Sequence, residues 1–310
     1  MFIEFPPFCY ALNFTLDKSA KFNYSKSNER RAKMNILFWN TNRKNPENVT
    51  ACLCELLLEN AVDLLILAEY PNITQDLCNT INASELDIPQ YIPIPAKKLK
   101  SKVKGIIINK LYSIKSVKED NRYQLAKITT PTYNLLVAMI HGKDIRNNPR
   151  LADRQHLIRQ FKNDIIEHEQ QQNCQHTIAI GDFNISPFEE PMFATEGMHA
   201  LPFADSFAKS TTKIGDAEYK KFYNPTWKLF ANKNPPFTTY YYKSDGGTSA
   251  LYWYAIDQVI ISPSLMDAFG NSLKIISKTA NHSLLKKGKP NEKIYSDHLP
   301  LFCQLEEEFM

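Results

Sequence analysis

Four consecutive residues, Gly181-Asp182-Phe183-Asn184, carry the clearest chemical signal in this sequence. They follow the apolar run 177–180, which predicts a short buried strand. Side chains two residues apart on a strand point to the same side, so we expect Asp182 and Asn184 to face the same way. A carboxylate beside a neutral amide can hold a nucleophilic water, a hard metal ion or a phosphate oxygen. Alone, these residues would equally suit a turn, because Gly, Asp and Asn are common in turns.

Five other strand-like runs carry an acid, an amide or an imidazole at or near one end. Taken singly, each such residue is more often a cap, a solvated turn or a structural histidine. Together they indicate a site assembled from the ends of strands and the loops beside them. These residues, with their runs, are Asn40 (35–39), Glu69 (63–68), His141 (135–140), Asp257 (within 254–261) and Asp297 with His298 (before 299–302).

In this order the motifs resemble those of the endonuclease/exonuclease/phosphatase superfamily, the deoxyribonuclease I-like proteins. The resemblance extends from about Met34 to about Gln304. It implies an α+β fold, a four-layer α/β/β/α sandwich of two mostly antiparallel sheets flanked by helices. It leaves the substrate open, because members cleave DNA, RNA, inositol phosphates and sphingomyelin. The matching motifs are Trp39-Asn40, Glu69, His141-Gly142, Gly181-Asp182-Phe183-Asn184, Asp257 and Ser296-Asp297-His298.

The resemblance also implies a role for each catalytic residue. His298 would act as general base or acid at the attacking water, and Asp257 would accept the other ring N–H of His298. Asp182 would orient the water or bind a second ion. Asn184 would donate a hydrogen bond to a phosphoryl oxygen, and His141 would contact the scissile phosphate.

The implied cofactor is Mg²⁺ or Mn²⁺. Glu69 and Asn40 would hold the ion through oxygen atoms, with Asp297 close by. Arg122, at the start of the predicted strand 123–129, occupies the place of a phosphate-contacting arginine in deoxyribonucleases of this fold. An ordinary surface arginine is an equal alternative at this position.

Three departures from family patterns bear on specificity. In deoxyribonuclease I a glutamate before the strand that matches 105–109 pairs with the residue that matches His141, whereas residues 96–104 contain no acid. The partner of His141 is therefore open. Abasic-site endonucleases usually carry Tyr at the position of His141. The Pro-Trp-Cys-Asp-Arg signature of inositol 5-phosphatases is absent, and 225–228 resembles only its first half.

Two segments have the composition of substrate-binding elements. One is a compact basic loop, and the other is a long loop, 219–254, rich in aromatic residues that include Trp227. Lysines with aromatic rings suit phosphate contact and base stacking. A solvated loop and ordinary strand packing are the alternatives. The basic loop contains Lys97, Lys98, Lys100, Lys102 and Lys104.

The remaining pattern predicts alternating strands and helices. Strands that follow one another without a crossover helix indicate antiparallel pairing. The expected helices are 49–60, 75–82 and a long polar helix from about Pro149 to Gln172. Further expected strands are 103–109, 111–117, 124–129 and 133–140.

Composition bounds the remaining possibilities. The chain has 310 residues without a linker or repeat, which predicts an N-terminal extension (1–33) followed by one domain (34–310). A net charge of +4 is compatible with a polyanionic partner. Six cysteines without metal-site spacing favour reduced, buried thiols. Without a long apolar run or a signal-like start, we expect no membrane span and a cytoplasmic location.

The sequence thus predicts a divalent-metal-dependent phosphoesterase, with nucleic acid as the favoured substrate. A phosphatase or phosphodiesterase for a small phosphorylated molecule or lipid headgroup is the enzymatic alternative. A catalytically idle domain that binds nucleic acid or protein is the alternative from another class, but it would have no need of His298 beside Asp257.

Overall fold

The structure of the chain is a computed structural model that describes residues 33–71, 74–84, 89–96, 102–108, 112–130, 132–144, 150–243, 251–307 and 310. The segment from Ala32 to Met310 forms one compact unit. The predicted N-terminal extension, apart from Lys33, lies outside the described residues, as do Lys97, Lys98 and Lys100 of the basic loop.

The first sheet has six strands in the order β16-β19-β1-β2-β4-β3. β1 runs parallel to β2, and the other neighbours in this sheet are antiparallel. The strands are β1 (Lys33–Asn40), β2 (Leu64–Ala68), β3 (Tyr91–Pro93), β4 (Val103–Ile108), β16 (Lys274–Ile275) and β19 (Leu301–Glu306).

The second sheet has seven strands in the order β5-β6-β7-β8-β15-β12-β9. Within it, β7 and β8 are parallel, as are β9 and β12, and the other pairs are antiparallel. The strands are β5 (Ser113–Glu119), β6 (Tyr123–Thr129), β7 (Asn134–His141), β8 (His176–Asp182), β9 (Ala200–Leu201), β12 (Phe222–Tyr223) and β15 (Asp257–Ile261).

Three two-stranded pairs complete the described strands: β10 (Thr211–Ile214) with β11 (Ala217–Lys220), β13 (Tyr240–Tyr241) with β14 (Trp253–Tyr254), and β17 (Leu285–Lys286) with β18 (Lys289–Pro290).

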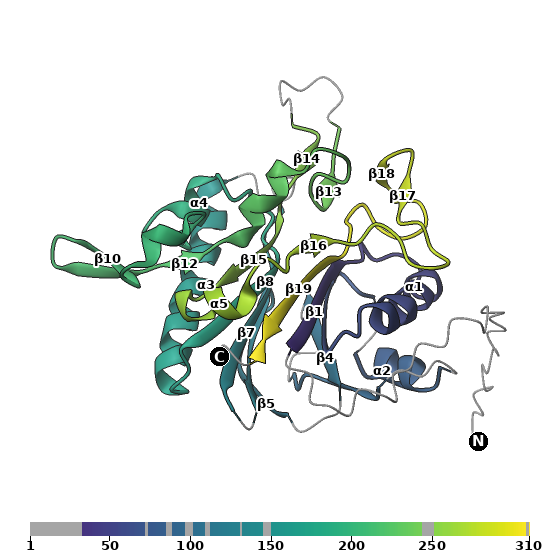
Figure 1. Ribbon diagram of the computed structural model, residues 1–310, viewed down its shortest axis with the longest axis horizontal. Coiled ribbons are helices and arrows are strands. Elements are labelled where there is room, and N and C mark those ends of the chain that lie inside the picture. Colours follow the sequence, from purple (N-terminus) through teal and green to yellow (C-terminus); the bar gives the residue numbers. More distant parts are fainter. Residues whose placement is uncertain are drawn as a thin grey trace, which may run out of the picture. The chain divides into compact units, whose positions relative to one another are not determined.

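Helices cover the outer faces of both sheets (Figure 1). α1 and α2 pack on the first sheet, and α3 packs on the second. The α-helices are α1 (Pro46–Glu59), α2 (Thr74–Asn82), α3 (Leu151–Gln171), α4 (Glu190–Phe193) and α5 (Met266–Phe269), and the 3-10 helices are η2 (Ala204–Phe207), η3 (Pro225–Ala231) and η4 (Pro263–Leu265). The expected four-layer sandwich is confirmed.

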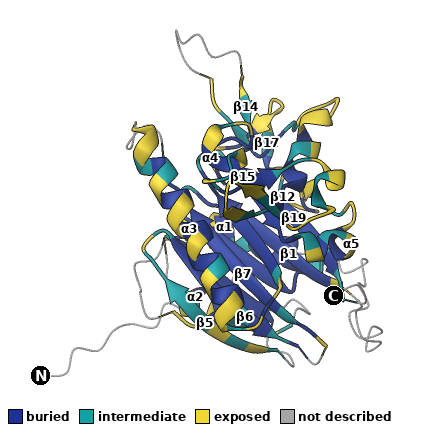
Figure 2. Cartoon of the chain, turned by 90° about the vertical axis from the view of Figure 1, so that its left-hand side faces the viewer, coloured by how far each residue is buried: buried dark blue, intermediate teal, exposed yellow. Residues whose placement is uncertain are grey.

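Strand alternation builds the core between the two sheets. Ile36 and Phe38 of β1 belong to the same buried cluster as Ile178 and Ile180 of β8. Leu37, between Ile36 and Phe38 on β1, points to the outer face of the first sheet and packs with the helices there. This is the period-two pattern of strands that are buried on both faces. Figure 2 shows the sheet buried behind α3, whose outer stripe is exposed.

Several predicted boundaries differ from the structure. α1 begins three residues early, because the Asn45 side chain accepts a hydrogen bond from the Glu47 amide and Pro46 fits the first helical turn. β19 begins at Leu301 rather than at residue 299. The aromatic segment 219–254 is not one long loop, since it contains parts of β11, β12, η3, β13 and β14. The prediction that Asp257 lies inside a continuous strand is wrong, because Asp257 is the first residue of β15.

Five cysteines lie within the described residues, and all are buried free thiols, as expected. Among the described helices, none combines the length and apolar composition needed to cross a membrane.

Candidate active site

Strand direction brings the candidate residues to one edge of the sandwich. Parallel β7 and β8 end side by side, with His141 opposite Asp182. Antiparallel β15 starts where β8 ends, so that Asp257 also lies opposite Asp182. In the first sheet, Asn40 ends β1 at the level where its parallel neighbour β2 ends. The topology, rather than closeness in sequence, therefore gathers these side chains.

Strand alternation also points these side chains between the sheets. Asn40 continues the row that contains Phe38, and Asp182 continues the row that contains Ile180. His141 and Asp257 extend the inward-facing rows of β7 and β15 in the same way. The apolar core thus passes directly into a polar layer at this edge.

A hydrogen bond joins the two sheets at the centre of the site. The Asn40 side-chain amide donates to Asp182 Oδ2 over 3.0 Å, and both side chains are buried. The other oxygen, Asp182 Oδ1, accepts the backbone N–H of Asn184 at 2.8 Å. The Ser296 hydroxyl donates to the Asn40 carbonyl at 2.6 Å and fixes the segment that carries Asp297. Burial, together with the neighbouring Asp257 carboxylate, raises the pKa of Asp182 to about 6.

His298 and Asp257 form a buried imidazole–carboxylate pair. His298 Nδ1 lies 2.8 Å from Asp257 Oδ2, and Asp257 is fully buried. Burial lowers the pKa of His298, but the charge and hydrogen bond of Asp257, together with the charges of Asp182 and Asp297, raise this pKa to about 10. Tyr240 covers the pair, with ring centroids 4.5 Å apart between Tyr240 and His298. Asp257 therefore fixes the orientation of the His298 ring and stabilises its protonated form.

Glu69 is the partner of His141 that the sequence left open. His141 Nε2 lies 3.1 Å from Glu69 Oε1 and 3.7 Å from Asp182 Oδ2. Arg43 Nε lies 3.1 Å from the other Glu69 oxygen. The hydrogen bond from His141 is the largest cause that lowers the pKa of Glu69, to about 2, so this carboxylate stays ionised.

Close backbone approaches hold the ends of β7 and β8 together. A Cβ on Gly142 would lie 2.1 Å from the Phe183 carbonyl oxygen, and one on Gly181 would lie 2.0 Å from the Ile140 carbonyl oxygen. Glu69 and Asn184 both adopt left-handed backbone conformations, with φ of 51° and 54°. Non-glycine residues rarely adopt this conformation, and it concentrates at functional sites.

The donor chemistry at this edge suits a hard divalent cation. Glu69 and Asp297 keep side-chain exposures of 22% and 20%, and their carboxylates, with the side-chain oxygen of Asn40, are the oxygen donors at this edge. Asp182, Asp257 and His298 form a second group, whose potential ligand atoms lie within 4.8 Å of one another. Oxygen-rich donors of this kind are those that Mg²⁺ and Mn²⁺ prefer.

Besides Arg43, two cationic side chains lie at this edge. Half-buried Arg122 donates from Nη1 to the Gly142 carbonyl at 2.8 Å, and its charge interacts with Glu69 and Asp182. Lys102 interacts electrostatically with Arg122 and Glu69. Lys104 belongs to β4 rather than to a loop, and its ammonium donates to the Tyr70 carbonyl at 3.0 Å. Of the described lysines in the predicted basic loop, Lys102 is thus the one placed at the site.

Trp227 lies in η3 rather than among the central carboxylates. Its indole packs against Phe188 and Phe230. Any link between this residue and the site therefore depends on the segments that adjoin it.

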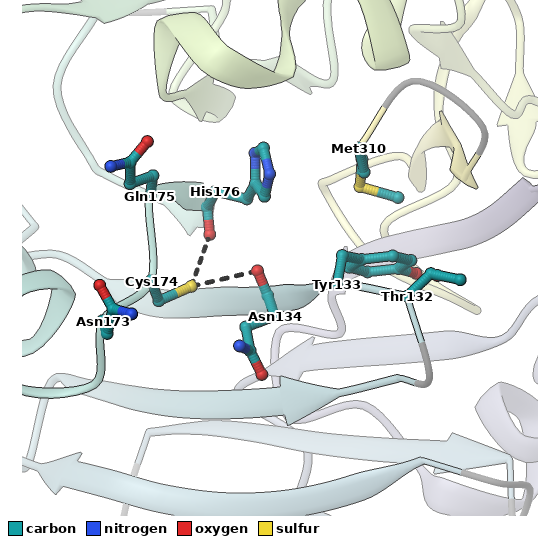
Figure 3. Close-up of a pocket in the computed structure, with 8 residues that line it drawn as sticks. All are labelled: Thr132, Tyr133, Asn134, Asn173, Cys174, Gln175, His176 and Met310. Carbon is teal, nitrogen blue, oxygen red and sulfur yellow. Dashed lines mark hydrogen bonds between the residues drawn. The ribbon is translucent and has the colours of Figure 1, made fainter.

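A separate cavity of about 280 Å³ lies at the opposite end of β7 and β8 (Figure 3). It is lined by Asn134 and His176, which start these strands, and by Cys174, whose thiol donates to the Asn134 carbonyl at 3.1 Å. Six strand steps separate His176 from Asp182, which corresponds to roughly 20 Å. This cavity is therefore distinct from the candidate active site.

Two residues at the site carry no functional signal in the sequence, Tyr240 and Arg43. Tyr240 was visible as one ring in an aromatic run, but nothing in the sequence placed it against His298. Arg43 follows Asn40 by three residues, without any motif that would mark it. Both reach the site through contacts between distant segments.

Comparison with protein-family models and with curated proteins found no match. Solved structures do match across 88% of this chain. An AP endonuclease from Leishmania major has a TM-score of 0.55 at 10% identity, with 88% of its chain covered. An endonuclease/exonuclease/phosphatase family protein from Bacteroides thetaiotaomicron has a TM-score of 0.52 at 13% identity, with 97% covered. TDP2 of D. rerio, in complex with a single-strand DNA product, has a TM-score of 0.50 at 15% identity, with 98% covered. The chain therefore has the deoxyribonuclease I-like fold of the endonuclease/exonuclease/phosphatase superfamily.

Proposed function

We propose that this protein is a divalent-metal-dependent phosphoesterase that hydrolyses phosphodiester bonds in DNA or RNA. The observation that carries the proposal is the buried His298–Asp257 pair beside Asp182, at an edge that also holds Glu69. A domain used only for binding would gain nothing from burying two carboxylates and an imidazole together, because unpaired buried charge is costly.

The pair provides the proton transfer that hydrolysis needs. Water is a weak nucleophile, so a base must accept its proton as it attacks phosphorus. His298 Nε2 exchanges the proton in this reaction, as base towards the water or, in its imidazolium form, as acid. Asp257 holds Nδ1 and stabilises the imidazolium. Asp182, fixed by Asn40 and the Asn184 amide, lies close enough to orient the same water.

Charge stabilisation is the second requirement, because negative charge accumulates on the phosphoryl oxygens. The side-chain amide of Asn184 makes no hydrogen bond with other described residues and remains available as a donor. Arg122 and Lys102 add positive charge at the same edge. Glu69, Asn40 and Asp297 would hold a Mg²⁺ or Mn²⁺ ion, which supplies Lewis-acid stabilisation of the phosphoryl group when bound.

A polynucleotide fits this arrangement better than a small phosphoester. Arg122 and Lys102 place cationic groups beside the carboxylates, where they can contact phosphates that flank the scissile one. Among proteins of similar fold, the D. rerio TDP2 structure contains a single-strand DNA product. The same fold is also compatible with a phosphatase for a small molecule or lipid headgroup, so the substrate needs a direct test.

The test is a hydrolysis screen with the full chain in Mg²⁺, in Mn²⁺ and in excess EDTA. The substrates are plasmid DNA, single-stranded DNA, RNA, inositol phosphates and bis(4-nitrophenyl) phosphate. Asp182→Ala is the inactive control, and Asp205→Ala, at an exposed position of η2, is the matched control. We expect metal-dependent nucleic-acid cleavage that Asp182→Ala abolishes and Asp205→Ala retains. Preferential cleavage of inositol phosphates would overturn the nuclease proposal. Inactivity on every substrate would overturn the phosphoesterase proposal.

A further inference from the structure

Three aromatic rings from two separate segments form a cluster on the surface, which we call the aromatic platform: Phe188, Trp227 and Phe230. The ring centroids lie 6.4 Å apart for Phe188 and Trp227, 6.1 Å for Phe188 and Phe230, and 6.0 Å for Trp227 and Phe230. Phe188 is 42% exposed and Phe230 is 39% exposed. Such a group of exposed rings loses favourable burial, and it marks an interaction surface more often than a single exposed ring does.

Buried hydrogen bonds fasten both segments of the platform to the catalytic strand β15. Gln258, next to Asp257, is fully buried and donates to the Ile185 carbonyl at 2.6 Å. Its side-chain oxygen accepts from Asn224 at 2.8 Å. Asn224 in turn caps η3 by accepting the Thr226 amide at 3.0 Å. One glutamine thus fixes the loop that leads to Phe188 and the helix that carries Trp227 and Phe230.

The platform lies within a short chain distance of the reaction centre. Phe188 follows Asn184 by four residues, which span at most roughly 14 Å when fully extended. Along a nucleic-acid strand, this distance corresponds to about four nucleotides at 3.4 Å per step. A strand whose scissile phosphate lies at Asn184 therefore reaches the platform with a base only a few nucleotides away.

We propose that the aromatic platform stacks an unpaired base of a single-stranded nucleic acid, close to the scissile phosphate. This inference rests on the nuclease activity proposed above and specifies the substrate as one with a single-stranded segment. An exposed ring offers a flat apolar face that matches a base in chemistry and size. A duplex keeps its base faces inside the stack and presents backbone and groove edges, so it would gain little from this surface.

The test compares Phe188→Ala with Phe193→Ala in the full chain. Phe193, on α4, is 43% exposed and matches Phe188 in exposure without a ring contact to the platform. Stacking of one base contributes about 1–3 kcal/mol. Phe188→Ala should therefore raise KM for a single-stranded oligonucleotide roughly 5- to 150-fold. KM for a blunt duplex and for bis(4-nitrophenyl) phosphate should change less than about twofold. Phe193→Ala should change none of these values.

Conservative variants separate stacking from general apolar contact. Phe188→Trp should keep a low KM for the single strand, whereas Phe188→Leu should behave as Phe188→Ala does. A series of strands shortened one nucleotide at a time should lose affinity in one step, at the length that no longer reaches the platform. Circular dichroism of each variant confirms folding, which these exposed positions should not affect.

The outcomes distinguish this inference from the proposed function. If no nucleic acid is hydrolysed while bis(4-nitrophenyl) phosphate is, the nuclease proposal itself fails. If nucleic acids are hydrolysed and Phe188→Ala matches Phe193→Ala on single strands, the platform inference fails and the nuclease stands. The stacking proposal would also fail if Phe188→Ala raised KM equally for single strands and blunt duplexes, or if Phe188→Leu kept the KM of the unmodified protein. Loss of concentration-dependent self-association in Phe188→Ala, without any change in KM, would assign the surface to a second copy of the chain instead.

Discussion

Asn40 and Asp182 belong to different sheets, yet the Asn40 amide donates to Asp182 Oδ2 over 3.0 Å. This hydrogen bond closes the polar edge of the sandwich and joins the two halves of the candidate site. The Asn40 side-chain oxygen accepts the Asn42 amide at 3.0 Å and keeps a second lone pair for a cation. The geometry of the candidate site therefore depends on how the two sheets pack against each other.

The pairing of Asp257 with His298 should control the chemical step. Asp257→Asn keeps the shape of the side chain but removes the charge that stabilises the imidazolium. We expect kcat to fall by about 10²–10⁴ with little change in KM. Steady-state kinetics on the best substrate would measure this. Asp267→Asn, an exposed acid in α5, is the matched control. If the two residues act as one unit, the double variant His298→Asn with Asp257→Asn should lose no more kcat than the worse single variant. A loss equal to the product of the two single losses would contradict this.

Glu69 should set the metal requirement. Glu69→Gln removes the ionised carboxylate held by His141 and Arg43 while it keeps a similar shape. The Mg²⁺ concentration for half-maximal activity should rise at least roughly tenfold, since anionic oxygen ligands determine affinity for a hard cation. A metal titration of initial rates, with circular dichroism as a folding check, measures the shift. Full activity of the unmodified protein in excess EDTA would contradict the prediction.

Lys102 and Lys104 offer a comparison between neighbouring lysines. Lys102 interacts with Arg122 at the site, whereas the ammonium of Lys104 donates to the Tyr70 carbonyl. Lys102→Gln should raise KM for a long substrate and reduce the slope of log KM against log salt by about one. Lys104→Gln should leave that slope unchanged. Rates measured at salt concentrations from about 50 to about 200 mM, where counterion release strongly affects binding, would check this. Equal slopes for both variants and the unmodified protein would exclude Lys102 from phosphate binding.

Lys162 should make stability rise with pH in the alkaline range. It is 4% exposed, and burial followed by the charge of Lys220 lowers its pKa to about 8. Between pH 8 and the ordinary pKa of about 10.5, the unfolded chain holds a proton that the folded chain has lost. Stability therefore increases with pH across this window, by an amount on the order of 3 kcal/mol. The cost of burying the ammonium is fully present below pH 8.

Urea unfolding at about pH 7.5, 8.5 and 9.5 tests the Lys162 prediction, because these values cover the range in which the folded protein loses the Lys162 proton. Lys162→Met fills a similar volume without an ionisable group, so its stability should lack the part of the rise that Lys162 causes. Subtraction of the two curves removes the titration of other groups. Parallel curves for the two proteins would show that Lys162 does not carry this dependence.

Gly142 should be intolerant of a side chain. A Cβ there would lie 2.1 Å from the Phe183 carbonyl oxygen, so Gly142→Ala must push β7 and β8 apart beside Asn184. We expect a loss of about 1–3 kcal/mol in stability and a large fall in kcat. Gly215→Ala is the control, because its Cβ would meet no atom within 4 Å and only the left-handed backbone, with φ of 59°, opposes it. Its cost should be about 1 kcal/mol without loss of activity. Normal activity of a folded Gly142→Ala protein would show that this contact does not position the site.

Residue types and local spacing determined much of this protein. Apolar runs located the strands, and the polar residues at their ends located the edge where Asp182, Asp257, Asn40 and His141 meet. These features were readable because strand alternation and strand ends are local properties of the chain. The same reasoning placed Asp257 within a strand rather than at its start, since element boundaries depend on pairing with Asp182 as well as on composition.

Only the tertiary structure decided which distant side chains touch. His141 contacts Glu69 although the two residues are far apart in the sequence, and Tyr240 covers His298 from a strand pair of its own. Phe188 packs against Trp227, and Gln258 on a third segment bonds to the segments that carry both rings. Such contacts depend on sheet order and register between strands that are not consecutive, and the stability of these arrangements comes from packing of the whole core. The sequence therefore determined the chemical groups available, and the folded sandwich determined which of them act together.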